Sequence, residues 1–120
     1  MRFWFPVIVY SGIIFFTSSV PNVRTPLAAF DFDKVLHLIE YAPFGFLVAR
    51  AMGGTRVLIS KRALWAGVVL ISFLYAASDE FHQSFVPGRN SGVFDLIADT
   101  VGGVMGGYLY MVLAQRILEK

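Results

Sequence analysis

The chain has 120 residues, of which 57% are hydrophobic and only 15% are charged, and its formal net charge is +2. A soluble domain is usually about 45–50% apolar and about 25% charged, so this composition indicates a membrane protein. The small net charge and the lack of a basic run argue against nucleic-acid binding. The absence of cysteine excludes disulfides, thiolate metal sites and cysteine nucleophiles.

The length sets the expected number of membrane crossings. One crossing takes about 20 apolar residues, so this chain accommodates four helices joined by short loops in one domain. The sequence therefore predicts an all-α fold, a polytopic membrane protein in which residues 1–120 form a four-helix transmembrane bundle. The helices are expected at about residues 3–18, 33–52, 63–85 and 95–118.

The first predicted helix has one arginine before it and small residues after it, a pattern that also occurs in signal peptides. We favour an uncleaved first span, because the uncharged run from Phe3 to Val23 is long enough to cross a bilayer. Pro6 falls in the first turns of this helix, where a missing N–H is tolerated. Pro21 and Pro26 are expected to end it.

The second predicted helix begins at Asp31 or Asp33, since an aspartate at the N-cap accepts an orphan backbone N–H. Gly53 and Gly54 are expected to end it. Its uncharged part is too short to span a membrane alone, so its polar first turns must enter the membrane or its interface. Spacings of three, four and seven place these residues on one side of the helix: Asp33, Lys34, His37, Glu40 and Tyr41.

Polar residues gather where the third predicted helix ends and the fourth begins. Ionisable side chains are costly within a membrane and usually mark a functional site. A turn rich in proline and glycine separates the two groups. The stretch contains Asp79, Glu80, His82 and Gln83 before the turn, Arg89 within it, and Asp95 and Asp99 after it.

The fourth predicted helix carries two overlapping glycine pairs, Gly102 with Gly106 and Gly103 with Gly107. A small residue at every fourth position lets another helix approach closely. We expect these glycines to contact the second or third helix, and they also suit a homo-oligomer.

Charged residues divide unequally between the two ends of the predicted bundle. Seven of the ten basic residues lie at the end that holds both termini, and seven of the eight acidic residues lie at the other. The positive-inside rule then predicts a multi-pass protein with cytoplasmic N- and C-termini. Asp33, Asp79 and Asp99 each lie 17 residues from a basic residue of the inner end, about 25 Å along a helix. This shared level predicts one pocket open to the outer leaflet.

Three separated motifs follow the pattern of a known family. They are Asp33-Lys34-x-x-His37-x-x-x-Tyr41, Asp79-Glu80-x-x-Gln83-x-Phe85-Val86-Pro87-Gly88-Arg89 and Asp95-x-x-x-Asp99-x-x-Gly102. Over about residues 31–107 the chain resembles the VanZ-like family, small bacterial membrane proteins named after one linked to resistance to the glycopeptide antibiotic teicoplanin. Asp99 departs from the pattern, because the family often has asparagine there. The resemblance implies a protein of the bacterial cytoplasmic (inner) membrane with an envelope or glycopeptide-tolerance role.

The leading functional hypothesis is a site for the headgroup of a membrane lipid or lipid-linked cell-wall precursor. Arg89 offers a planar donor fork for phosphate or carboxylate, and Lys34 adds a point charge. Carboxylates and Gln83 accept hydrogen bonds from hydroxyls, amines and amides. The expected binding residues are Asp33, Lys34, Tyr41, Gln83, Arg89, Asp95 and Asp99. The alternative is a non-catalytic interaction or structural protein whose polar groups only hold the helices together.

Catalysis is a second hypothesis, and the sequence leaves open whether the protein is an enzyme. His37 is the expected general base, and Asp79 or Glu80 is the expected general acid. A nucleophile elbow of the GxSxG type is absent from the sequence.

Metal binding and transport are the remaining hypotheses. No cofactor is expected. A divalent metal stays as a less favoured alternative, at His37 with Glu40 or at Asp79 or Glu80 with His82. Transport would require a dimer or larger complex, because the charged groups stop at one side of the predicted membrane.

Overall fold

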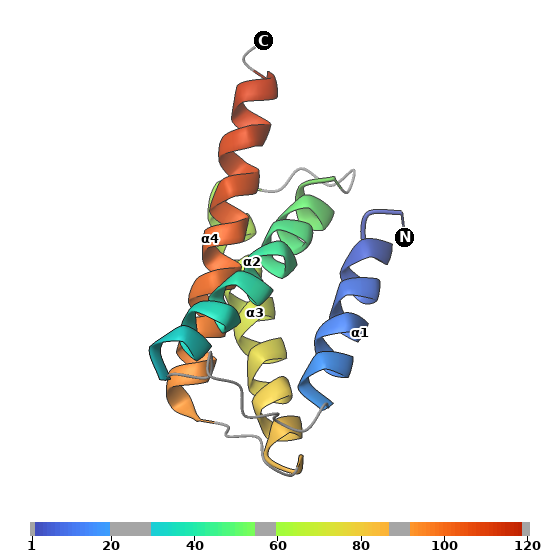
Figure 1. The fold of residues 1–120 in the computed structure, drawn as a ribbon. Coiled ribbons are helices and arrows are strands. Elements are labelled where there is room, and N and C mark those ends of the chain that lie inside the picture. Colours follow the sequence, from blue (N-terminus) through green and yellow to red (C-terminus); the bar gives the residue numbers. More distant parts are fainter. Residues whose placement is uncertain (1, 20–29, 55–59, 87–91, 119–120) are drawn as a thin grey trace.

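The computed structural model describes residues 2–19, 30–54, 60–86 and 92–118, and within these ranges it describes every side chain outside residues 30–34 and 115–118. The described residues form four helices: α1 (Phe5–Ser19), α2 (Phe30–Gly54), α3 (Lys61–Gln83) and α4 (Val93–Leu118). Consecutive helices run in opposite directions, and α1 lies on the far side of α2 and α3 from α4 (Figure 1). The prediction of an all-α, four-helix architecture is confirmed.

Three of the four described helices are long and apolar enough to cross a membrane. They contain the candidate spans Val35–Gly54, Lys61–Gln83 and Val93–Ala114. α1 is apolar but has only 15 residues, which is about 22 Å of helix against a hydrocarbon core of about 30 Å. α1, which was predicted as the first of four spans, is therefore shorter than the hydrocarbon core is thick. The large apolar side chains on the outside of the bundle, such as Phe16 and Phe94, suit a lipid environment.

The glycines of α4 bring α2 and α3 into close contact with it. A Cβ added at Gly106 would lie 1.7 Å from the Ala42 carbonyl oxygen of α2. A Cβ at Gly102 would lie 2.4 Å from the Leu38 carbonyl oxygen of α2, whereas those at Gly103 and Gly107 would meet the side chains of Ser72 and Val68 on α3. The two pairs thus contact the second and third helices, as the sequence analysis expected. Self-association through these glycines would have to displace α2 or α3.

Several helix ends differ from the predicted ones. α2 begins at Phe30, so Asp31 and Asp33 lie inside the helix, and the prediction that one of them is the N-cap is wrong. α3 begins at Lys61 because the Ser60 hydroxyl caps it by accepting a hydrogen bond from a backbone N–H at 3.1 Å. It ends at Gln83 rather than residue 85, because the N–H groups of Phe85 and Val86 bond to carbonyls three residues back and tighten the chain into a turn.

Candidate functional site

A buried polar cluster lies where α2 begins, α3 ends and α4 begins. Ten residues were predicted to form the site, and seven of them have described side chains. All seven are buried: His37, Tyr41, Asp79, Glu80, Gln83, Asp95 and Asp99. The side chains of Asp33 and Lys34, and the whole of Arg89, lie outside the described residues. The sequence analysis therefore named the described members of a cluster that α2, α3 and α4 bring together.

His37 lies between two carboxylates of α4. Its Nδ1 is 2.7 Å from Oδ1 of Asp99, a hydrogen-bond distance, and Asp99 is completely buried. Its Nε2 is 3.9 Å from Oδ1 of Asp95. Asp95 and Asp99 are four residues apart, which puts both on the face of α4 that meets α2. A carboxylate beside an imidazole fixes the ring orientation and favours a proton on the facing nitrogen.

A second contact joins α2 to α3 one helical turn further along. The Tyr41 hydroxyl donates to Oδ2 of Asp79 at 3.1 Å. Because Tyr41 follows His37 by four residues, the same face of α2 contacts both neighbouring helices. The two buried contacts align α2, α3 and α4 at this end of the bundle.

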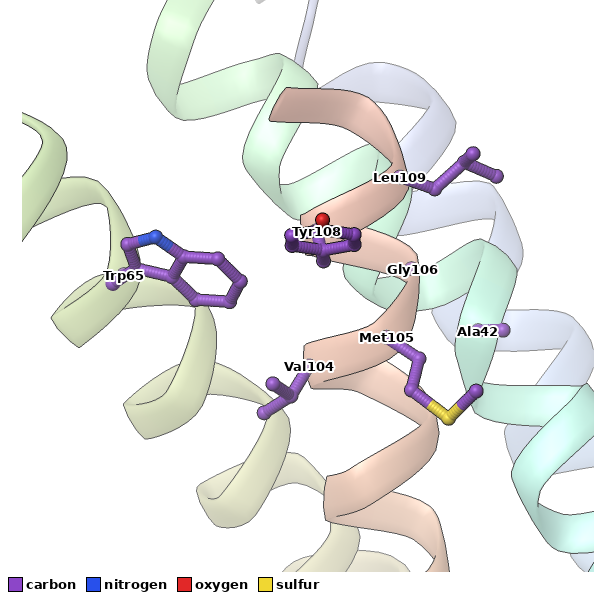
Figure 2. A pocket seen from close by; sticks show the side chains of 7 residues that line it. All are labelled: Ala42, Trp65, Val104, Met105, Gly106, Tyr108 and Leu109. Carbon is purple, nitrogen blue, oxygen red and sulfur yellow. The ribbon is translucent and has the colours of Figure 1, made fainter. Parts of the chain in front are cut away.

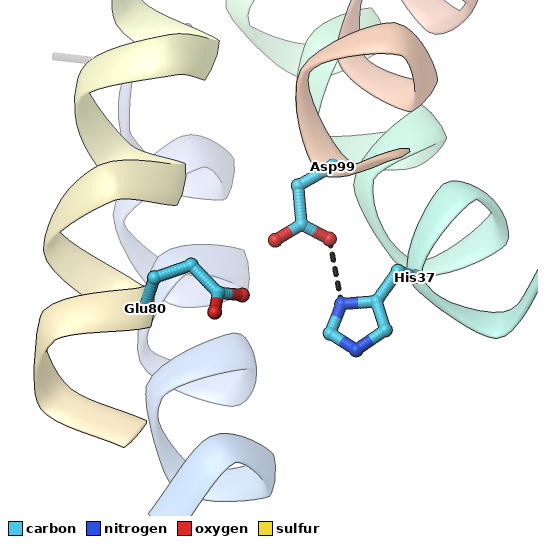
Figure 3. Close-up of side chains that lie close together, drawn as sticks. All are labelled: His37, Glu80 and Asp99. Atoms are coloured by element: carbon cyan, nitrogen blue, oxygen red, sulfur yellow. Dashed lines mark hydrogen bonds and ion pairs between the residues drawn. The ribbon is translucent and has the colours of Figure 1, made fainter. Parts of the chain in front are cut away.

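Glu80 completes the centre of the cluster. Its Oε2 accepts a hydrogen bond from the backbone N–H of Gly92 at 3.0 Å, next to the start of α4. Figure 3 shows the carboxylate of Glu80 reaching from α3 toward Asp99 on α4 and His37 on α2. One potential ligand atom from each of these three residues lies within 4.8 Å of the others. The arrangement offers nitrogen and oxygen ligands from three helices.

Four oxygens of the cluster are buried without a hydrogen-bond partner in the part of the chain that the structure describes. They are Asp79 Oδ1, Glu80 Oε1, Gln83 Oε1 and Asp99 Oδ2. A buried acceptor that loses its partner costs about 1–3 kcal/mol. Each oxygen can accept from a donor group or contact a cation, so the cluster retains binding capacity that its internal bonds do not use.

Two residues that the sequence analysis paired with this cluster face α1 instead. The Thr17 hydroxyl donates to Oε1 of Glu40 at 2.9 Å. Nε2 of His82 lies 2.7 Å from the Ser19 hydroxyl oxygen, and the His82 ring stacks on Phe15 at a centroid distance of 4.3 Å. The metal sets predicted with Glu40 or His82 stay predictions, and the described side-chain hydrogen bonds of these two residues go to α1. The period of a helix predicts which of its side chains share a face, but it does not predict where α1 packs. The contacts of Glu40 and His82 with α1 could therefore not be predicted from spacing.

The sequence analysis also missed the hydroxyl groups that hold α1 beside the site. Tyr10 donates to the backbone carbonyl of Glu40 at 2.5 Å, and Tyr75 donates to the carbonyl of Ser11. Neither tyrosine belongs to the polar cluster. The only available signal was the spacing of hydroxyl residues along α1, which also suits bonds within a helix.

Apolar grooves lie on the outer surface of α4, toward the middle of the bundle. Figure 2 shows one of them, with Trp65 of α3 on one side and Tyr108 and Met105 of α4 beside it. A second groove is lined by residues of α2 and α4, and both grooves include Ala42 and Gly106. They arise where the small residues bring two helix backbones together. Their apolar lining suits hydrocarbon chains rather than a polar ligand.

Comparison with known proteins gives one family. The family model VanZ/LLP1 matches residues 3–114. No curated protein and no solved structure matches the chain. The matched range includes all four helices up to the last turn of α4, and so every described residue of the cluster. The match confirms the resemblance seen in the three motifs, and the chain belongs to the VanZ/LLP1 family.

Proposed function

We propose that this protein binds the headgroup of a membrane lipid or lipid-linked cell-wall precursor at the polar cluster between α2, α3 and α4. One observation carries the proposal: the cluster holds four buried acceptor oxygens without a described partner. Sugar hydroxyls, amines and amides are the donors that such oxygens accept. A headgroup with several donors would satisfy groups that otherwise cost free energy on burial.

The chemistry around the cluster supports a lipid rather than a water-soluble ligand. Three of the four described helices are long and apolar enough to cross a membrane, and the grooves beside α4 have apolar linings. A lipid would have its headgroup in the cluster and its acyl chains on the apolar surface. Lys34 and Arg89 are proposed to add positive charge for a phosphate, since both belong to the motifs of the family.

The proposed location is the bacterial cytoplasmic membrane, with both termini in the cytoplasm and the cluster on the outer side. The distribution of charge supports it: Arg50, Lys61 and Arg62 lie at the helix ends opposite the cluster. The chain has no cysteine, so single-cysteine variants test the orientation directly. A membrane-impermeant maleimide should label Ser84→Cys in intact cells, and Lys61→Cys only after lysis. The reverse pattern would contradict the orientation.

Lipid-headgroup binding is tested with purified protein in detergent and in nanodiscs. Asp79→Asn keeps the shape of the side chain and removes one charged acceptor, which should weaken binding of a polyprenyl-pyrophosphate-linked sugar at least tenfold. A charged hydrogen bond contributes about 1.5–3 kcal/mol, and tenfold corresponds to about 1.4 kcal/mol. Glu40→Gln is the matched control, because Glu40 faces α1. Native mass spectrometry should find co-purified lipid on the wild type and the control.

The opposite outcome supports a structural function for the cluster. If Asp79→Asn lowers the melting temperature strongly in the absence of lipid, and no lipid binds the wild type, the polar groups only hold the helices together. The contacts of His37 with Asp99 and of Tyr41 with Asp79 are the ones that would do so. An envelope role such as glycopeptide tolerance follows from headgroup binding only if the ligand is a cell-wall precursor.

One observation favours catalysis on the bound headgroup as a second candidate. A carboxylate holds the imidazole of His37, which is how a general base is positioned, and Glu80 and Asp79 each have an oxygen directed to no described donor. Replacing His37 by Gln should then abolish turnover of the lipid while leaving its binding within about threefold of wild type. Mass spectrometry of the lipid before and after incubation provides the measurement. An unchanged lipid with the wild type would contradict catalysis on that substrate.

A further inference from the structure

We propose that His37, Glu80 and Asp99 form a binding site for one divalent transition-metal ion. The sequence analysis predicted other pairings, with Glu40 or His82, and the described side-chain hydrogen bonds of both residues go to α1. The structure instead joins one residue from each of three helices (Figure 3). The site goes beyond the proposed headgroup site, because the ion needs no lipid in order to bind.

The distances fit a metal centre after a small adjustment. In an octahedral site with bonds of about 2.1 Å, neighbouring ligand atoms lie about 3.0 Å apart and opposite ones about 4.2 Å. Nδ1 of His37 and Oδ1 of Asp99 are already 2.7 Å apart, and the ligand atoms of all three residues lie within 4.8 Å of one another. A shift of the Glu80 carboxylate by about 0.6 Å reduces a separation of 4.8 Å to the roughly 4.2 Å between opposite ligand atoms.

An independent observation points to a cation at this place. Oδ2 of Asp99 and Oε1 of Glu80 have no hydrogen-bond partner among the described residues, although Asp99 is 0% and Glu80 9% exposed. In Figure 3 the two carboxylates face each other across the space beside the His37 ring. Two carboxylates facing each other repel when both are charged, and a divalent cation between them removes that repulsion.

The ligand types select the class of metal. One imidazole nitrogen with carboxylate oxygens suits Mn²⁺ or Zn²⁺ better than Ca²⁺, which prefers six to eight oxygens. With Nδ1 on the ion, Nε2–H of His37 faces Asp95, whose Oδ1 is 3.9 Å away and would orient the ring. Three protein ligands leave further positions open for an oxygen of a bound molecule. In this state His37 is a ligand rather than a general base.

The first experiment measures metal binding to the full chain, purified in detergent with a tag that contains no histidine. Protein stripped with a chelator and dialysed against Mn²⁺ should retain about one ion per chain, with a melting temperature that rises with Mn²⁺ concentration. Asp99→Asn and Glu80→Gln should each bind Mn²⁺ at least tenfold more weakly, whereas Glu40→Gln should match the wild type. If the wild type retains no stoichiometric Mn²⁺ or Zn²⁺, or both variants bind as tightly as it does, the proposal is overturned.

A second experiment reports the imidazole directly and does not depend on the stability of the carboxylate variants. The chain has two histidines, so electron spin echo modulation from ¹⁴N on bound Mn²⁺ has two possible sources. The modulation should persist in His82→Gln and disappear in His37→Gln. Its absence in the wild type, or its loss in His82→Gln alone, would refute the site. Lipid binding measured in excess chelator separates the two proposals. If lipid binds there, and the protein retains no metal in the first experiment, the metal site is refuted and the headgroup site is not.

Discussion

The replacement of Gly106 by alanine tests one of the two closest backbone approaches at the glycines that the structure describes. The added Cβ would lie 1.7 Å from the carbonyl oxygen of Ala42, and the obstacle is backbone that cannot rotate away. The helices must therefore move apart by more than 1 Å, since ordinary contacts of this kind begin at about 3.4 Å. Overpacking of a tight core usually costs about 1–3 kcal/mol, and a rigid backbone obstacle places Gly106→Ala near the upper value.

The matched control for this prediction is Gly12→Ala in α1. A Cβ at Gly12 meets nothing within 4 Å, so the substitution should keep the stability or raise it by about 0.5–1 kcal/mol through the lower flexibility of the unfolded chain. Thermal unfolding in detergent, followed by circular dichroism, compares the two variants. The contact between His37 and Asp99 spans the same helix pair, so Gly106→Ala should also weaken metal or lipid binding. Equal melting temperatures for Gly106→Ala and the wild type would refute the reasoning.

Three further substitutions test contacts around the site. Tyr41→Phe removes the donor to Asp79 and leaves a second oxygen of that carboxylate without a partner, which should cost about 1–3 kcal/mol in thermal unfolding. Ser60→Ala removes the N-cap of α3 and should cost about 1 kcal/mol; a melting temperature equal to wild type would contradict the cap. Thr17→Val removes an exposed bond to Glu40 and should leave global stability within about 0.5 kcal/mol while hydrogen exchange in α1 becomes faster. Unchanged exchange there would show that this bond does not hold α1.

The sequence predicted which residues of α2, α3 and α4 gather, because helix periodicity and charge act over a few turns. Asp79 and Asp99 could be placed at one level because each lies 17 residues from a basic residue at the other end of its own helix. Periodicity and charge did not predict which carboxylate His37 contacts. His37 had Glu40 three residues away, yet it contacts Asp99, which is 62 residues away in the chain. Contacts of that range depend on how helices rotate against each other, and local spacing does not encode the rotation.

The position of α1 explains the other differences. Their spacing from His37, Asp79 and Glu80 had suggested that Glu40 and His82 belong to the same site. In the structure, hydroxyl groups of α1 contact both of them. Serine and threonine in an apolar helix also bond to their own backbone, as Ser11 does with the carbonyl of Val7, so their presence alone predicts no docking face. Several helix ends differed from the predicted ones by two or three residues. α3, for example, was predicted to begin at Ala63 but begins at Lys61, because Ser60 is its N-cap.

The balance of energies distinguishes a structural cluster from a binding site. Hydrogen bonds between helices in membrane proteins contribute about 0.6 kcal/mol on average, and His37 with Asp99 and Tyr41 with Asp79 supply two of them. A buried acceptor left without any partner costs about 1–3 kcal/mol, which is more than one such bond contributes, and four oxygens of the cluster have no partner among the described residues. The glycines of α4 also hold α2 and α3 by direct contact, so packing and polar contacts both contribute to the cohesion of the three helices. A bound headgroup or metal ion that contacts these oxygens would remove this cost, and this is the energetic basis of both proposals.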